Sequence, residues 1–328
     1  MHLLTKPSFK KKDFLNFLIA LFPLSFIAGN MIININLLLL TVSSIIFFKK
    51  DLLKIKFFIL DKLIFSFFFI VILTGIVNDY YFYTFYNEEI AYRGYFTTFL
   101  KSIYFLKYLL LYIVLRFLVE KEIVNLKLFF IFCFVAVLFV SLDIIFQFLN
   151  GEDIFGFEGK GRKLSGPFGD ELIAGGFIQR FSLFSFFIIP LFFENSNIKK
   201  YNKYFVSIIF LIFLSGIILS GNRMPFLIFI FMIFLLLIAE KQTRKFLLPF
   251  LLFILISFFT LFKTTIIVKS NFSNFFNQIS RTANLVVNKD FFNEKSPHYL
   301  KEFSTFYDTW LMNKYIGGGI KNFRYYCH

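Results

Sequence analysis

The 328-residue sequence predicts an all-α protein, a polytopic bundle of about nine transmembrane helices. Two observations carry this prediction. Hydrophobic residues fill 58% of the chain. A water-surrounded core cannot hide that much apolar surface, whereas a bilayer is itself an apolar solvent. The basic residues also gather in short segments between the apolar runs, as they do in membrane proteins of fixed orientation.

The candidate spans follow from the apolar runs, since a helix needs about 20 apolar residues to cross the hydrocarbon core. Polar or basic residues bound each run. The runs are 14–29, 31–48, 60–77, 96–118, 124–149, 172–193, 204–220, 223–239 and 246–263. No clear cleavage site of small residues follows the first run, so we expect a retained anchor and not a removed signal peptide.

The charges of the connecting segments give a predicted orientation. Basic sets precede the first span and follow the second, fourth, sixth and eighth, which puts them all on one side of a nine-span bundle. By the positive-inside rule that side is the cytoplasm, and the N-terminus lies there. The net charge of +15 is explained by these sets, so we expect no nucleic-acid partner.

The chain divides at about residue 263. Residues 1–263 form the predicted helix bundle with short loops, and residues 264–328 form a polar segment on the outward side. No closing helix follows this segment. We therefore expect 264–328 to be the start of a larger outward loop, in a chain that lacks its C-terminal part.

Polar residues inside the spans are costly and need an explanation. Counted at 1.5 Å per residue, Lys101, Asp143 and Gln147 lie in the outer half of the membrane. Arg180 lies deeper in the sixth span, and Arg223 opens the eighth. These five residues suggest a cavity for an anionic head group. The alternative is a set of structural ion pairs, such as Lys101 with Asp143, and of side chains that reach to the interface.

The loop from Gly151 to Glu171 is rich in glycine and carries Arg162 between two lysines. Glycine lets a backbone approach a ligand closely, and basic side chains suit phosphate, so Arg162 and Gly166 are candidate binding residues. Asp170 and Glu171 are further candidates, or simply the acidic start of a helix. Neither a Walker loop nor a dinucleotide fingerprint is present, and no cysteine or histidine has metal-ligand spacing, so we expect no cofactor and no metal.

The outward segment contributes aromatic residues and histidines. Residues 299–314 have the pattern of an amphipathic helix, and Trp310 suits either an interfacial helix or a platform on which a sugar stacks. A histidine is the natural general base near neutral pH, although a loop histidine such as His298 or His328 is often only solvated.

Four stretches resemble the O-antigen ligase and polymerase superfamily of bacterial surface-polysaccharide enzymes. The third, Leu219-Ser-Gly-Asn-Arg223, is similar to the family's small residues followed by an arginine at a helix start. The fourth is similar to the family's loop segment in which a tryptophan precedes a glycine-rich turn. The other two follow the family's order along the chain; all four are 143–156, 164–176, 219–223 and 310–323.

The resemblance implies a GT-C-like bundle in the bacterial inner membrane, with residues 264–328 in the periplasm. It also implies a metal-independent, inverting glycosyltransferase. The donor would be a glycan on undecaprenyl pyrophosphate, and the acceptor a saccharide, either the lipid A core or another repeat unit. Arg223 matches the family arginine, and Arg180 is a second candidate for the leaving pyrophosphate. The resemblance places a histidine that assists the acceptor hydroxyl after the glycine-rich turn: either His328 is near that motif, or the histidine lies beyond the end of this sequence.

Two other classes stay open at this point. A transporter or flippase for a lipid-linked saccharide would also need a cationic cavity, although the two halves of the chain show no internal repeat. A non-catalytic membrane scaffold would explain the topology, but it would give no role to Arg180 or to the glycine-rich loop.

Overall fold

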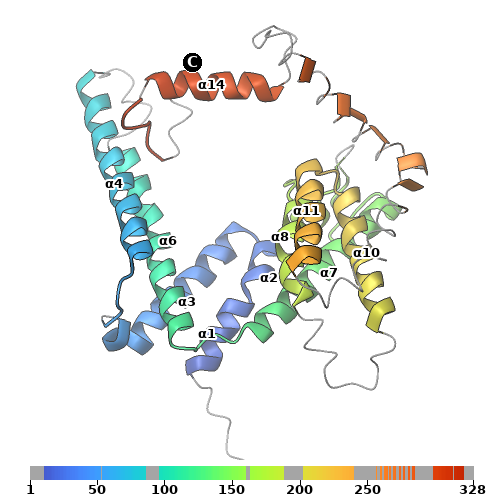
Figure 1. Ribbon diagram of the computed structural model, residues 1–328, viewed down its shortest axis with the longest axis horizontal. Coiled ribbons are helices and arrows are strands. Elements are labelled where there is room, and N and C mark those ends of the chain that lie inside the picture. Colours follow the sequence, from blue (N-terminus) through green and yellow to red (C-terminus); the bar gives the residue numbers. More distant parts are fainter. Residues whose placement is uncertain are drawn as a thin grey trace, which may run out of the picture. The chain divides into compact units, whose positions relative to one another are not determined.

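The computed structural model describes residues 11–52, 54–85, 96–159, 163–187, 202–239, 298–312 and 314–320, together with scattered positions from 256 to 284. Figure 1 shows a protein built from helices. Within the described ranges there is no strand, and a single isolated bridge pairs Glu152 with Glu158. The all-α prediction is confirmed for this part of the chain.

Four helices are long and apolar enough to cross a membrane: α3 (Asn30–Leu52), α4 (Ile59–Phe85), α6 (Thr97–Glu120) and α7 (Leu126–Asn150). They coincide with the second to fifth predicted runs. A helix satisfies every backbone hydrogen bond within itself, which is why apolar runs of this length adopt it in lipid. The chain is therefore compatible with a membrane helix bundle.

Three shorter helices follow, α8 (Ala174–Phe186), α10 (Asn202–Leu219) and α11 (Arg223–Ala239). They begin within two residues of the sixth, seventh and eighth predicted runs. Most of the ninth run, 246–263, lies outside the described residues. The number of nine spans therefore stays a prediction.

The first predicted run forms two helices and not one, α1 (Lys11–Ala20) and α2 (Phe22–Ile27). The cause is Pro23, which lacks the N–H that would bond to the carbonyl of Ile19. The helical hydrogen bonds continue on either side of this gap, from Leu21 N to Phe17 O and from Ser25 N to Leu21 O.

By packing, the chain forms two compact units, each described here by itself. Unit 1 contains residues 1–40 and 123–277, and unit 2 contains residues 41–122 and 278–328. These units group residues that pack together, whereas the predicted division at residue 263 concerns the membrane, so that division stays a prediction.

Unit 1 is organised around α7, which packs against α1, α2, α8 and α10. One face of α7 is fully buried and carries small and branched residues, including Cys133, Ala136 and Val140. Gly216 of α10 permits a close approach to α7, because a Cβ there would lie 3.0 Å from Ser141 Cα. This packing fixes the end of α7 from which the glycine-rich loop departs.

Unit 2 is organised around the antiparallel pair of α4 and α6. Asp79 near the end of α4 accepts hydrogen bonds from the backbone N–H groups of Thr98 (3.2 Å) and Phe99 (2.8 Å), at the start of α6. Gly75 lies against Ser102, since a Cβ at Gly75 would be 2.5 Å from Ser102 Oγ. The helix α14 (His298–Met312) also belongs to this unit.

Candidate functional site

The glycine-rich loop is fastened to the end of α7 by two side chains of that helix. Gln147 Nε2 donates to Phe157 O (2.9 Å), and Gln147 Oε1 accepts from Gly166 N (2.9 Å). One turn earlier, Asp143 Oδ1 accepts from Ile154 N (3.0 Å). Asp143 and Gln147 lie on one face of α7, as their spacing predicted, and both are buried.

The loop is also held from within. The buried Asp153 accepts hydrogen bonds at Oδ1 from the backbone N–H groups of Phe155 (3.0 Å) and Phe157 (2.6 Å). Gly159 N donates to Gly151 O (3.1 Å), which closes the loop into a short hairpin-like turn. The loop therefore has a defined shape over the residues that the structure describes on either side of 160–162.

Glycine is needed where the loop returns to α7. Gly166 has a φ of +53°, and a Cβ there would lie 3.0 Å from Ile144 Cγ1 and 3.6 Å from Asp143 Oδ2. A larger residue would push the loop off the helix. Gly166 thus acts through close packing, and it presents its N–H to Gln147.

These contacts refine the roles predicted for Asp143 and Gln147. Both amide atoms of Gln147 bind the loop backbone, so Gln147 positions the loop. Asp143 Oδ2 makes no hydrogen bond to any residue that the structure describes, and it is the one acceptor of this pair that the loop does not use. Lys101 belongs to unit 2 and Asp143 to unit 1, so their predicted pairing stays a prediction.

The start of α8 packs tightly on the turn that precedes α11. A Cβ at Gly175 would lie 2.3 Å from Ser220 Oγ and 2.9 Å from Asn222 Cβ. Asn222 Nδ2 also donates to Leu172 O (3.2 Å). We call this contact the α8–α11 seam, formed by residues 172–176 and 220–225.

One candidate arginine lies in the seam and the other lies one turn beyond it. Arg223 is the first residue of α11, directly after Asn222, and it is partly buried. Arg180 follows Gly176 by one turn, so the two share a face of α8, and a Cβ at Gly176 would lie 4.0 Å from Pro225 Cγ of α11. Arg180 is exposed and makes no hydrogen bond or ion pair within the described part of the chain.

Asp170 and Glu171 are exposed on the approach to α8. The helix begins at Ala174, and its first turn contains no acidic residue. The structure therefore does not support the alternative in which these two residues form the acidic start of a helix. Glu171 N instead donates to Phe168 O (3.1 Å), within the turn that follows the short 3-10 helix Gly166–Phe168.

Other predicted site residues lie in unit 2 or outside the described ranges. Lys101 is partly buried near the start of α6. Trp310 is 51% exposed on α14, with Lys314 Nζ 5.8 Å from its ring centre. Arg162 and His328 lie outside the residues that the structure describes, so nothing further is said of their surroundings.

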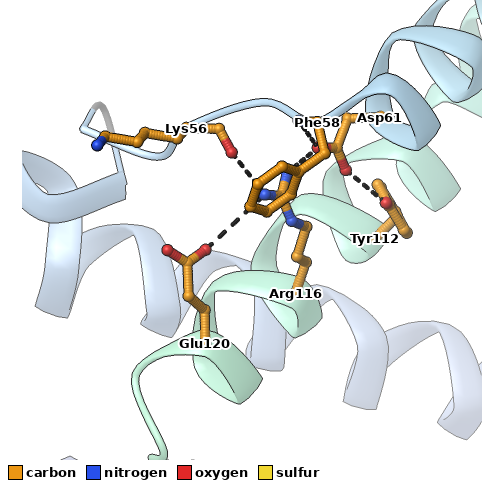
Figure 2. A network of polar contacts seen from close by, with 6 residues as sticks. All are labelled: Lys56, Phe58, Asp61, Tyr112, Arg116 and Glu120. Carbon is orange, nitrogen blue, oxygen red and sulfur yellow. Dashed lines mark hydrogen bonds and ion pairs between the residues drawn. The ribbon is translucent and has the colours of Figure 1, made fainter.

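Sequence reasoning missed a polar network at the opposite end of the α4–α6 pair, which Figure 2 shows in close-up. The buried Asp61 of α4 forms an ion pair with Arg116 of α6. It also accepts hydrogen bonds from Tyr112 OH (2.6 Å) and from the backbone N–H of Phe58 (2.6 Å).

Arg116 extends this network to the segment before α4. Its Nη2 donates to Lys56 O (2.5 Å), and its guanidinium lies 4.9 Å from the centre of the Phe58 ring. The sequence held a signal for it: Asp61 is a carboxylate within an apolar run, and Tyr112 and Arg116 stand four residues apart on the next long helix. We infer that the network stabilises the packing of α4 against α6 at this end of the pair.

An apolar hollow of about 550 Å³ lies in unit 1 beside the glycine-rich loop. Residues of α2 and α7 line one side, and Phe155, Phe157 and Pro167 of the loop region line the other. Within the described residues no group of three or more histidine, cysteine or acidic side chains is arranged to hold a metal ion.

Comparisons with known proteins add no relative: no family model, no curated protein and no solved structure matches this chain.

Proposed function

We propose that the chain is a metal-independent, inverting glycosyltransferase with a GT-C-like bundle. It would transfer a glycan from undecaprenyl pyrophosphate to an acceptor saccharide, as an O-antigen ligase or polymerase, at the periplasmic face of a bacterial inner membrane. The proposal starts from the resemblance of four sequence stretches to that superfamily.

The observation that carries the proposal is the convergence of three of these stretches in unit 1. Gln147 of the first stretch binds Gly166 N of the second (2.9 Å). Asn222 of the third binds Leu172 O, again in the second (3.2 Å). These hydrogen bonds bring three of the four stretches together in unit 1.

Two arginines and an apolar hollow lie near the place where these three stretches meet, and both features suit a polyprenyl pyrophosphate. Arg223 lies in the α8–α11 seam and Arg180 lies one turn beyond it on α8. A guanidinium binds phosphate oxygens through paired donors. The apolar hollow beside the loop has the chemistry that an isoprenoid chain needs.

In the proposed reaction the acceptor hydroxyl oxygen attacks the anomeric carbon of the donor glycan. The bond from that carbon to the pyrophosphate oxygen breaks, and undecaprenyl pyrophosphate leaves with the electron pair. Arg180 and Arg223 stabilise the negative charge that develops on the leaving group. The acceptor proton passes to a base, for which His328 is the candidate.

The test is glycan transfer in proteoliposomes. The donor is the undecaprenyl-pyrophosphate-linked saccharide isolated from the host, and the host lipid A core and a second repeat unit are supplied as acceptors in separate reactions. We expect Arg223→Ala and Arg180→Ala each to lower the rate by about 100-fold, because each removes a donor to the developing charge. Arg223→Lys should retain part of the rate.

Lys121→Ala is the matched control. Lys121 is an exposed cation at the end of α6, on the predicted cytoplasmic side, and its loss should leave the rate unchanged. Full transfer by both arginine variants would show that the leaving group binds elsewhere. Passage of the lipid-linked saccharide across the bilayer without cleavage would overturn the transferase and favour the transporter.

A further inference from the structure

The helix α14 (His298–Met312, red in Figure 1) has one apolar face and one polar face. The large apolar side chains recur at spacings of three and four residues, at Phe303, Phe306, Tyr307, Trp310 and Leu311. These spacings put them on one side of a helix. We call this side the aromatic face.

The aromatic face is exposed. Phe303 is 70% accessible and Trp310 is 51% accessible, and the three residues between and beside them are also exposed. Phenylalanine and tryptophan at such exposure on a regular helix indicate a surface that meets an apolar partner.

α14 cannot itself cross a bilayer. Its 15 residues extend about 22 Å, less than the roughly 30 Å of hydrocarbon. Its other side carries Lys301, Glu302, Thr305 and Asp308, which would be costly to bury in lipid. A short helix of this composition is suited to lie along a membrane surface.

A hydrogen bond from a buried side chain ties the chain just after α14 to the last part of α4. Asn78 Nδ2 donates to Gly317 O (2.8 Å) and to Thr74 O (2.7 Å), and Asn78 is buried. Asn78 directly follows the predicted run 60–77 and lies in the last part of α4. Gly317 is thereby held near the predicted outer end of that run.

This tether limits the position of α14. Four residues lie between Met312 and Gly317, and the five steps from one to the other span at most about 18 Å. The end of α14 therefore stays close to the interface in which Trp310 and Tyr307 are preferred residues.

We propose that α14 lies in the plane of the membrane, with its aromatic face in the boundary between headgroups and acyl chains of the leaflet at the C-terminal end of α4. The partner is the lipid surface itself. The proposal rests on α14 and Asn78 and not on the proposed transferase activity, so either can fail without the other.

The charge of α14 defines the kind of lipid surface. Lys301 and Lys314 are balanced by Glu302 and Asp308 across α14 and the turn after it. Attachment is therefore driven by apolar burial and not by attraction to anionic lipid, and we expect it to be insensitive to salt and to anionic lipid content.

Trp310 makes the test direct, because it is the only tryptophan in the chain. The full chain is reconstituted into phosphatidylcholine vesicles that contain lipid brominated at shallow or at deep acyl positions, and Trp310 emission is recorded. We expect a blue-shifted emission, quenching that is stronger with shallow than with deep bromine, and protection from aqueous acrylamide. Neither 0.5 M salt nor added phosphatidylglycerol should change the quenching by more than about 1.2-fold, as an apolar attachment requires.

Two variants of equal charge distinguish loss of lipid attachment by the aromatic face from a general effect of adding a carboxylate to α14. Phe303→Asp places a carboxylate on the aromatic face and should reduce lipid quenching at least about 2-fold. Thr305→Asp places the same carboxylate on the polar face and should leave the quenching unchanged.

Three results would overturn the proposal. The first is an emission typical of tryptophan in water, with no bromolipid quenching, in a chain whose circular dichroism shows that it is folded. The second is equal loss of quenching in both variants. The third is protection of Trp310 from acrylamide by a soluble oligosaccharide and not by lipid, which would assign the aromatic face to a sugar.

Discussion

Two neighbouring glycines of α8 should respond in opposite directions to the same substitution. A Cβ at Gly175 would lie 2.3 Å from Ser220 Oγ, 2.9 Å from Asn222 Cβ and 3.0 Å from Asn222 Nδ2. A Cβ at Gly176 would meet only Pro225 Cγ, at an ordinary 4.0 Å. The structure therefore predicts that Gly175→Ala separates α8 from the turn before α11 and that Gly176→Ala does not.

The magnitude follows from overpacking. Forcing a methyl group into a filled interface costs about 1–3 kcal/mol, whereas glycine to alanine in an unstrained helical position gains about 0.4–1 kcal/mol through the unfolded chain. Since both glycines are in the first turn of α8, the gain is shared and the difference between the two variants isolates the clash. Gly175→Ala with Ser220→Ala should recover part of the loss, because the contact with Asn222 Cβ remains.

The assay uses the buried thiol of Cys133, which lies in the core of unit 1. In a Cys327→Ser background Cys133 is the only thiol, so a fluorogenic maleimide reports the temperature at which that core opens. At about 2–4 °C per kcal/mol, Gly175→Ala should melt several degrees below the parent and Gly176→Ala at or above it. If both variants melt together, the close approach of α8 to Ser220 and Asn222 is refuted.

Three further outcomes test the polar contacts. Gln147→Leu should speed tryptic cleavage of the glycine-rich loop, because it removes the hydrogen bond to Phe157 O and leaves the buried N–H of Gly166 without a partner, at about 1–3 kcal/mol; unchanged cleavage would contradict the fastening role. Arg116→Met should lower the melting temperature far more than Glu120→Ala, since Glu120 is 45% exposed and 3.9 Å from Arg116, a surface pair worth under about 1 kcal/mol. Asn78→Ala should raise amide hydrogen exchange in 314–320, measured by mass spectrometry, while exchange elsewhere in unit 2 stays the same; equal exchange would show that Asn78 does not hold Gly317.

The positions of the long helices could be predicted because they depend on local properties. Runs 31–48, 60–77, 96–118 and 124–149 became α3, α4, α6 and α7, each with shifted ends. A long apolar segment has one way to satisfy its backbone in lipid, so length and composition are sufficient. Pro23 is a local signal for the break between α1 and α2. The prediction of one continuous span over 14–29 used only the number of apolar residues and so did not include this break.

The partners of the polar residues could not be predicted in the same way. The hydrogen bond from Ile154 N to Asp143 Oδ1 could not be read from depth along the helices, because it depends on how the loop after α7 folds back. The partners of Asp61 could not be predicted either, because they lie 51 and 55 residues away in the sequence, on α6. A carboxylate in an apolar run needs a hydrogen-bond donor or a cation when it is buried. The sequence does not show which donor the fold will place beside it.

The sequence by itself therefore determined the class of protein, the helices that could cross a membrane and the amphipathic character of α14. These depend on composition and on the 3.6-residue period of the helix. Only the tertiary structure decided that Gln147 fastens the glycine-rich loop, that Gly175 seats the turn before Arg223, and that Asn78 ties Gly317 to α4. Such contacts join residues far apart in the chain, and they exist only once helix packing has chosen one close approach among many.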